Sequence, residues 1–248
     1  MTVTLDDPDR RNAMTAPMTD SWRRVMREIA EDEAARCVVV TGAGSAFCSG
    51  GDLGWIGAEP GAPVDRLRAK MLPFYKIWLS IRDLPIPTIA AVNGPAVGAG
   101  ACLALACDLR YATDGAKFAV PFTRLGMHPG MAATWLLPEV VGIAGARELL
   151  YTGRAVSGAE AVALGVYNRV FPAADFAGEV ARIAAEIAAT APIAVQLTKE
   201  ALVGTGHESF EAALRWEALA QPITMATEDL QEGLAAQRDK RAPRFTGR

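Results

Sequence analysis

Two short apolar strands, each running directly into a glycine-rich turn, are the feature that most limits how this chain can fold. Residues 37–41 are rich in valine and typical of a buried strand, which Gly42 and Gly44 end. Residues 88–92 form a second run of the same kind, and the glycine-rich segment 93–103 follows it. Glycine after a strand lets the backbone approach a ligand closely and present its N–H groups. The sequence therefore predicts two strands that each end in a turn able to hold a ligand.

Helical periodicity surrounds these strands. Apolar residues recur every three or four positions over 18–29 and 67–81, which predicts two helices, the second disturbed at Pro73. The alternation of strand, turn and helix is typical of βαβ units and a mostly parallel sheet. Toward the C-terminus only helical patterns remain. We therefore expect an α/β core over residues 1–175 and a helical region over residues 176–248.

Composition excludes several classes of protein. With 51% hydrophobic residues and a formal net charge of −3, the chain can bury a core and lacks the basic balance of a nucleic-acid-binding protein. Its 4 cysteines form no C-x-x-C pair, and its 2 histidines leave few metal ligands. The longest apolar run, 88–105, is interrupted by Asn, Gly and Pro, and the first residues lack the apolar segment of a signal peptide. We expect a soluble, cytoplasmic protein with no metal ion, no cofactor of its own, and neither nucleic acid nor membrane as a partner.

The glycine-rich turns do not match the common phosphate-binding or nucleophile motifs. No Gly-Lys-Ser/Thr triplet of a P-loop occurs, and Gly98-x-Gly100 is followed by Leu103 where a dinucleotide fingerprint needs its third glycine. A nucleophile elbow fails because Phe47 lies two residues before Ser49. Two interpretations remain: two structural turns without a function, or an oxyanion hole formed by one backbone N–H group from each turn.

The order and spacing of many short segments resemble the crotonase superfamily, also called the enoyl-CoA hydratase/isomerase family, over nearly the whole chain. The matching segments are 8–14, 42–53, 87–94, 98–100, 107–108, 125–130, 149–153 and 161–166. The resemblance implies a crotonase-type α/β fold, a spiral of repeated ββα units followed by a helical C-terminal region. It also implies that this region closes the pocket and assembles the protein into a homotrimer or a dimer of trimers.

The same resemblance implies a chemistry. Members of the family bind acyl-CoA thioesters and stabilise an enolate through two backbone N–H groups, and the matching positions here are Gly51 and Ala99. One such donor contributes roughly 10²–10³ in rate. Coenzyme A then enters as part of the substrate, and the basic segment 238–245 is either near its phosphates or a solvated tail. The residues expected to bind substrate are Arg11, Asn12, Ala13, Gly50, Asp52, Leu53, Gly98, Cys102, Phe122, Pro129 and Gly130.

The chain departs from the family at the two positions where hydratases carry the glutamates that activate water. Cys102 and Phe122 stand there instead. His128 is the most attractive replacement base because imidazole titrates near neutral pH. Glu139 is a weaker candidate, and Asp108 has the pattern of a structural acid at the start of a strand.

Three functions therefore compete. The first is an enoyl-CoA hydratase or isomerase of fatty-acid or related acyl-CoA metabolism, which we favour on the family resemblance. The second is an acyl-CoA-binding protein without catalysis, suggested by Cys102 and Phe122. The third is different enolate chemistry, such as decarboxylation or thioester hydrolysis, with His128 as the base. A dinucleotide-dependent enzyme is a distant alternative.

Overall fold

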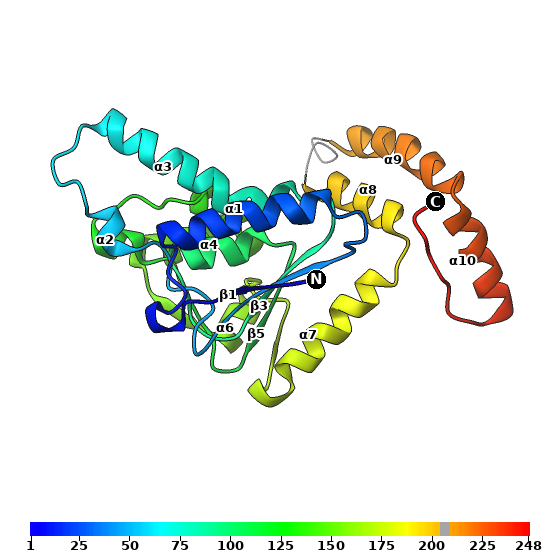
Figure 1. The fold of residues 1–248 in the computed structure, drawn as a ribbon, viewed down its shortest axis with the longest axis horizontal. Helices are drawn as coiled ribbons and strands as arrows, with labels where there is room; N and C mark the ends of the chain where they lie inside the picture. The colour runs from blue at the N-terminus through cyan, green and yellow to red at the C-terminus, as the bar shows by residue number, and fades with distance from the viewer. Residues whose placement is uncertain (204–208) are drawn as a thin grey trace.

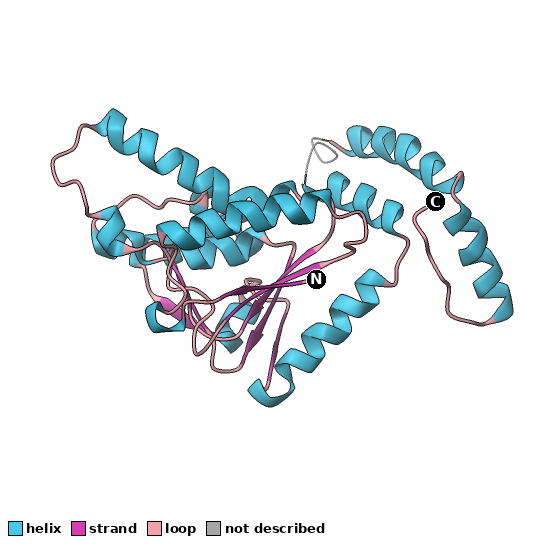
Figure 2. Ribbon diagram, in the orientation of Figure 1, coloured by secondary structure: helices cyan, strands magenta, loops and turns pink. Residues whose placement is uncertain are grey.

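A five-stranded parallel sheet lies at the centre of the computed structural model, which describes residues 1–203 and 209–248 (Figures 1 and 2). The remaining segment, 204–208, contains the second histidine, His207, which lies outside the described residues. The strands are hydrogen-bonded in the order β1 (Thr2–Leu5), β2 (Val38–Gly42), β3 (Thr88–Val92), β5 (Leu109–Thr113) and β8 (Arg169–Phe171).

The two strands predicted most strongly, β2 and β3, are neighbours in this sheet. They pair in parallel, with Val39 opposite Ile89 and Thr41 opposite Ala91. All five residues of β3 are buried, and so are four of the five in β2. Because a central parallel strand is covered on both faces, it must be apolar almost throughout, and this explains the continuous apolar runs in the sequence.

A second, three-stranded sheet adjoins the first. It is formed by β4 (Ala96–Val97), β6 (Lys117–Ala119) and β7 (Ala155–Ser157), with β4 parallel and β7 antiparallel to β6. The short helix η3 (Pro121–Leu125) follows β6. The strand β4 occupies the middle of the second glycine-rich turn, so this sheet fixes the position of that turn.

Several helices cover one face of the central sheet (Figure 2). They include α1 (Ala16–Glu31), α3 (Val64–Leu79) and α4 (Ala99–Ala106), and α5 (Ala133–Thr152) packs against α4 and η3. The predicted first helix is confirmed, and Thr15 caps it by accepting a hydrogen bond from Met18 N. The second predicted helix continues through Pro73. Trp22 of α1 stacks on Trp78 of α3 with ring centroids 5.0 Å apart, which joins the two helices.

From residue 173 onward the described elements are all helices, and an irregular segment, 240–248, ends the chain. The helix α7 (Ala173–Ala188) packs against β3, β5 and β8, and its buried residues Phe176, Val180 and Ile183 follow the predicted helical spacing. The helix α8 (Pro192–Val203) then folds back beside the core, and α9 (Phe210–Met225) and α10 (Glu228–Asp239) extend away from it (Figure 1). The other short elements are η1 (Pro8–Arg10), α2 (Leu53–Ile56), η2 (Ser80–Asp83) and α6 (Gly158–Ala163).

Length and hydropathy argue against a single membrane-spanning helix among the described residues. Only α7 and α8 taken together meet such a test, and they are bent by 104° relative to each other.

Candidate active site

The two glycine-rich turns lie directly against each other. The N–H groups of Phe47 and Cys48 donate to Pro95 O at 3.1 and 3.2 Å, and Val97 N donates to Cys48 O at 3.0 Å. A Cβ atom added to Gly100 would lie 2.7 Å from Cys48 Cβ, closer than any side chain can pack. The contact between the turns therefore depends on backbone hydrogen bonds and on the missing side chain at position 100.

Asn12 holds the first turn in shape. Its side chain is fully buried, and its Nδ2 donates to the carbonyl oxygens of Ala43, Ala46 and Phe47 at 2.9, 2.8 and 3.2 Å. Its Oδ1 accepts a hydrogen bond from Asp7 N at 2.9 Å. Both ends of the amide are therefore engaged within the protein. The structure places Asn12 beneath the turn and away from the cavity described next.

A cavity of about 100 Å³ opens between the two turns, helix α3 and the loop that follows η3. Its lining is mostly apolar, which suits an acyl chain. The residues that line it are Ser49, Gly50, Gly51, Leu53, Ile56, Met71, Phe74, Tyr75, Val97, Gly98, Ala99, Pro121, Phe122, Leu125, Met127, His128, Gly130 and Met131.

Eight of the residues expected at the site line this cavity, and the others do not. The lining residues are Gly50, Gly51, Leu53, Gly98, Ala99, Phe122, His128 and Gly130. The residues that do not contribute to the wall are Arg11, Asn12, Ala13, Asp52, Cys102 and Pro129. The structure thus brings the two expected N–H donors together at one cavity, while the roles of the individual residues remain predictions.

The backbone N–H groups of Gly51 and Ala99 are free. Ala99 is the first residue of α4, where an N–H group has no partner within the helix. Gly51 pairs with Met14 through an isolated bridge that uses Gly50 O as an acceptor and leaves the Gly51 N–H unused. In the described parts of the chain neither N–H group has an acceptor. Two free donors on the wall of an apolar cavity form a site that can bind a carbonyl oxygen.

Cys102 is unsuited to proton transfer. Its side chain is fully buried, and its Sγ lies 3.8 Å from Gly130 O. Burial raises the pKa of this thiol far above its ordinary value, because a thiolate would lose its hydration. The thiol therefore stays protonated and behaves as a small apolar side chain.

His128 is exposed and has a defined ring orientation. Its Nδ1 lies 2.8 Å from Pro129 O, and a carbonyl oxygen can only accept. This contact therefore requires the hydrogen on Nδ1 and leaves the lone pair of the neutral ring on Nε2. The imidazole can act as a base through Nε2.

The acidic residues considered for catalysis do not line the cavity between the turns. Asp52 caps helix α2, where its Oδ1 accepts a hydrogen bond from Trp55 N at 2.7 Å. Glu139 is exposed on α5 and borders a different cavity. No carboxylate belongs to the residues that line the cavity between the turns.

Sequence reasoning missed Tyr75 and the methionines of this cavity. Tyr75 lies one helical turn after Met71 on α3, and both line the cavity. Met71 belongs to the apolar stripe that predicts this helix, so its neighbour at i+4 lies on an adjacent part of the same face. The helical spacing in the sequence places Tyr75 beside Met71, but it does not show which cavity this face of α3 borders.

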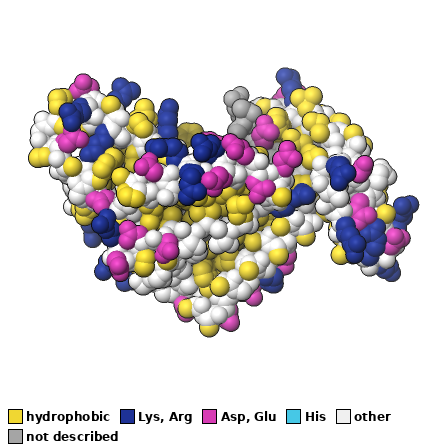
Figure 3. Space-filling view, viewed as in Figure 1, with side chains coloured by type: hydrophobic (Ala, Val, Ile, Leu, Met, Phe, Trp, Pro, Cys, Tyr) yellow, Lys and Arg dark blue, Asp and Glu magenta, His cyan; other side chains and the backbone are white. Residues whose placement is uncertain are grey.

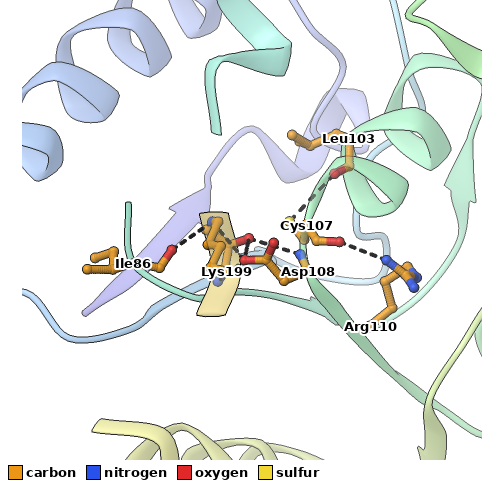
Figure 4. Close-up of polar contacts among 7 residues, drawn as sticks. Ile86, Leu103, Cys107, Asp108, Arg110 and Lys199 are labelled. Carbon is orange, nitrogen blue, oxygen red and sulfur yellow. Dashed lines mark hydrogen bonds and ion pairs between the residues drawn. The ribbon is translucent and has the colours of Figure 1, made fainter. Parts of the chain in front are cut away.

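A larger cavity of about 750 Å³ lies between α8 and the core, and its two buried cations, Lys199 and Arg110, are hydrogen-bonded within the protein (Figure 4). Lys199 Nζ donates to Ile86 O and to Asp108 Oδ2, both at 2.8 Å. Arg110 donates to Val166 O and to Cys107 O, both at 2.7 Å. The Lys199 bonds attach α8 to the residues that precede β3 and β5, whereas the Arg110 bonds lie within the core. Neither Gly51 nor Ala99 lines this cavity, so it is not the candidate site.

Asp108 also accepts hydrogen bonds from Thr88 N at 2.7 Å and from Thr88 Oγ1 at 2.8 Å (Figure 4 shows the cluster). Asp108 directly precedes β5, so these bonds link the start of β5 to the start of β3 and to Lys199 of α8. The predicted structural role of this acid is consistent with these bonds.

Comparison with known proteins decides the family. The family model described as "Enoyl-CoA hydratase/isomerase" matches residues 1–248. The chain belongs to the enoyl-CoA hydratase/isomerase family. A putative enoyl-CoA hydratase of Thermus thermophilus is 37% identical over 243 residues, covering 98% of this chain and 96% of the relative. The 1,2-epoxyphenylacetyl-CoA isomerase of Escherichia coli is 34% identical over 249 residues, covering 100% and 95%.

The crotonase-type fold expected for an enoyl-CoA hydratase/isomerase family member is confirmed by solved structures. The crystal structure of an enoyl-CoA hydratase from Bacillus anthracis superposes with a TM-score of 0.93 at 34% identity, covering 100% of this chain and 95% of that one. The family binds acyl-CoA thioesters, and the cavity between the two turns is the place in this fold where two free N–H donors meet.

Proposed function

We propose that this protein is an enzyme that binds an acyl-CoA or enoyl-CoA thioester in the cavity between the two turns and stabilises its enolate. The observation that carries the proposal is the pair of free N–H groups of Gly51 and Ala99 on one apolar wall. Hydrogen bonds to a thioester oxygen strengthen as negative charge develops on it, so they lower the barrier to enolate formation. The N-terminus of α4 at Ala99 adds its positive dipole to the same site.

Proton transfer fits this cavity better than activation of water. Hydration requires groups that position and deprotonate a water molecule, and none of the lining residues is a carboxylate. Shifting a double bond requires only that a proton leave one carbon and another proton reach a second carbon. We assign the base to His128 Nε2, so isomerisation is the favoured reaction and hydration the second.

A protein that binds the thioester without converting it is the alternative. It is favoured by the buried thiol of Cys102 and the ring of Phe122 at the two positions where hydratases of the family carry glutamates. The binding groups would be the same, so binding alone does not distinguish the two functions.

The deciding experiment is a panel of acyl-CoA, 2-enoyl-CoA and 3-enoyl-CoA esters scored for binding by calorimetry and for product. Hydration removes the absorbance of the conjugated enoyl group, whereas isomerisation of a 3-enoyl ester creates it. We expect the 3-enoyl esters to be converted. Micromolar binding without any product would support the binding protein, and neither binding nor product would overturn both.

We also propose that the C-terminal helices assemble the protein into a trimer or a dimer of trimers. Large apolar side chains are exposed on α9, with Phe210 at 81%, Leu219 at 69% and Ile223 at 53% of full exposure, and Figure 3 shows hydrophobic side chains on this part of the surface. Exposed apolar patches of this kind mark association surfaces. Sedimentation equilibrium should give three or six chains, and a monomer at micromolar concentration would contradict the proposal.

The four cysteines are free. Because free thiols are typical of a reducing compartment, we propose the cytoplasm as the location.

A further inference from the structure

Tyr75 places a hydroxyl group at the cavity that neither the mechanism above nor the sequence motifs use. The residue belongs to α3, is half-buried, and lines the cavity together with Gly51 and Ala99. Its ring meets Phe74 edge-on, with the centroids 6.2 Å apart. No hydrogen-bond partner within the described residues engages its oxygen. Because the side chain is half-buried and its hydroxyl is unpaired within the described protein, the oxygen is available to a ligand.

Gly130 makes room for this hydroxyl. A Cβ atom at Gly130 would overlap Tyr75 Oη and would lie 2.9 Å from Tyr75 Cζ. The oxygen therefore sits against the backbone of Gly130, whose carbonyl in turn faces the thiol of Cys102 at 3.8 Å. The phenol thus lies on the side of the cavity next to position 102, where a family carboxylate is missing.

Two other side chains of the cavity wall, Ser49 and His128, can carry a transferable proton. Ser49 Oγ donates to Arg10 O at 3.2 Å and is engaged within the protein. His128 offers a lone pair at Nε2, as argued above. Burial, with a smaller contribution from Cys102, raises the pKa of the Tyr75 hydroxyl, so it stays protonated at neutral pH. The cavity therefore contains one free proton donor, Tyr75, and one free base, His128, among its described lining residues.

We propose that Tyr75 is the catalytic acid of this site and delivers its phenolic proton to the carbon of the enolate. The inference rests on the proposed function. In the step, the charge on the thioester oxygen returns to re-form the C=O bond, and the electron pair of the enolate forms a C–H bond. The O–H bond of Tyr75 breaks and leaves a phenolate. The phenolate regains a proton from the His128 imidazolium or from water, which restores the site.

The test is Tyr75→Phe, which keeps the ring and removes the hydroxyl. On the 3-enoyl ester that the wild type converts, we expect kcat to fall roughly 10²-fold, as for the loss of a general acid, with little change in KM. Deuterium incorporation into the product from D2O should fall in parallel. The affinity for a saturated acyl-CoA should stay unchanged. If Tyr75 had only a structural role, this affinity would fall together with kcat and deuterium incorporation. Tyr151→Phe is the matched control, because Tyr151 is exposed on α5 away from the cavity.

Gly130→Ala provides a second variant, because its methyl group displaces the hydroxyl without removing it. We expect kcat to fall in Gly130→Ala as it does in Tyr75→Phe. Wild-type kcat in Tyr75→Phe would overturn the assignment. If Ala99→Pro, which removes an N–H donor, loses activity while Tyr75→Phe keeps it, only the assignment of Tyr75 fails. If Ala99→Pro also keeps the wild-type rate, or the wild type converts no ester, the proposed function fails with it.

Discussion

Val97 N donates a hydrogen bond to Cys48 O across 3.0 Å, and this contact joins two turns that lie about fifty residues apart in the sequence. Each turn contributes one of the two free N–H groups of the candidate site. The distance between Gly51 and Ala99 therefore depends on how closely Cys48 approaches the second turn, and that approach is possible because position 100 has no side chain.

Gly100→Ala should force the two turns apart. Its methyl group would lie 2.7 Å from Cys48 Cβ and 2.8 Å from Cys48 C, so the backbone must move. We expect a loss of about 1–3 kcal/mol in the free energy of unfolding, as for overpacked cores, together with lower activity. Urea unfolding followed by circular dichroism measures the first quantity.

Gly178→Ala is the control for that variant. Gly178 is exposed on α7, and a Cβ there would meet nothing within 4 Å. In a helix this change should stabilise the protein by about 0.5–1 kcal/mol. Equal effects of the two substitutions would show that the contact between the turns is not tight.

Lys199→Met should loosen the attachment of α8 to the sheet. The Lys199 ammonium is buried between Ile86 O and Asp108 Oδ2, whereas Asp108 keeps its bonds to Thr88 after the change. We therefore expect the free energy of unfolding to fall by about 3 kcal/mol, the lower end of the range for a broken buried ion pair. Arg182 serves as a comparison, because its ion pairs with Glu179 and Glu186 are exposed and Arg182→Ala should cost less than about 1 kcal/mol. A change in stability no larger than that of Arg182→Ala would contradict the structural role of Lys199.

Stability should fall at alkaline pH because of the buried cysteines. Burial raises the pKa of Cys37 from 9.0 to about 11 and the pKa values of Cys48 and Cys107 from 9.0 to about 12. Above pH 9 the unfolded chain therefore releases these protons while the native protein keeps them. Because the native state then binds more protons, the free energy of unfolding decreases as pH rises from 9 toward 12.

The measurement is urea unfolding at about pH 8 and about pH 10.5, a range that spans the ionisation of an unfolded thiol. Cys37→Ala should show a smaller decrease between the two pH values, because one of the linked groups is gone. An equal decrease in the variant would remove Cys37 from the explanation.

Cys102→Ala should leave turnover almost unchanged. The thiol is fully buried with a raised pKa and does not line the cavity, so it is neither a nucleophile nor a base. A thiol reagent such as iodoacetamide should also fail to modify Cys102 until the protein is unfolded. A large fall in kcat, or rapid alkylation of native Cys102, would show that the thiol takes part.

Elements with a strong local pattern could be predicted from the sequence. The strands β2 and β3 are buried on both faces, so their valine- and alanine-rich runs are nearly continuous, and the buried residues Trp22, Met26 and Ile29 of α1 keep a helical spacing. The turn that carries Ala99 was predictable because Gly98 adopts a positive φ of 56°, a conformation that favours glycine.

Residues whose role depends on distant partners could not be predicted in this way. Asn12 is expected beside the ligand, yet its amide bonds to the carbonyls of Ala43, Ala46 and Phe47. Tyr75 belongs to a helix whose spacing fixes a face but not the cavity that the face borders. In both cases the deciding contact joins segments far apart in the sequence, and only the packed structure shows it.

Ala99→Pro is the sharpest variant for the oxyanion hole. Proline is tolerated in the first turn of a helix, and the Ala99 N–H has no acceptor in the described structure, so α4 should keep its fold. The substitution removes one N–H donor and places the proline Cδ where the hydrogen was, so the affinity for butyryl-CoA is measured together with the rate. Ala99→Gly keeps the N–H and is the matched control.

The most direct measurement is the exchange of α-hydrogen for deuterium in saturated butyryl-CoA incubated in D2O, followed by NMR. This exchange reports enolate formation without any further step. We predict that the wild type and Ala99→Gly catalyse it and that Ala99→Pro is slower by roughly 10²–10³, as for the loss of one oxyanion donor. Exchange at the wild-type rate in a folded Ala99→Pro variant would contradict the proposal that the two turns hold the enolate oxygen.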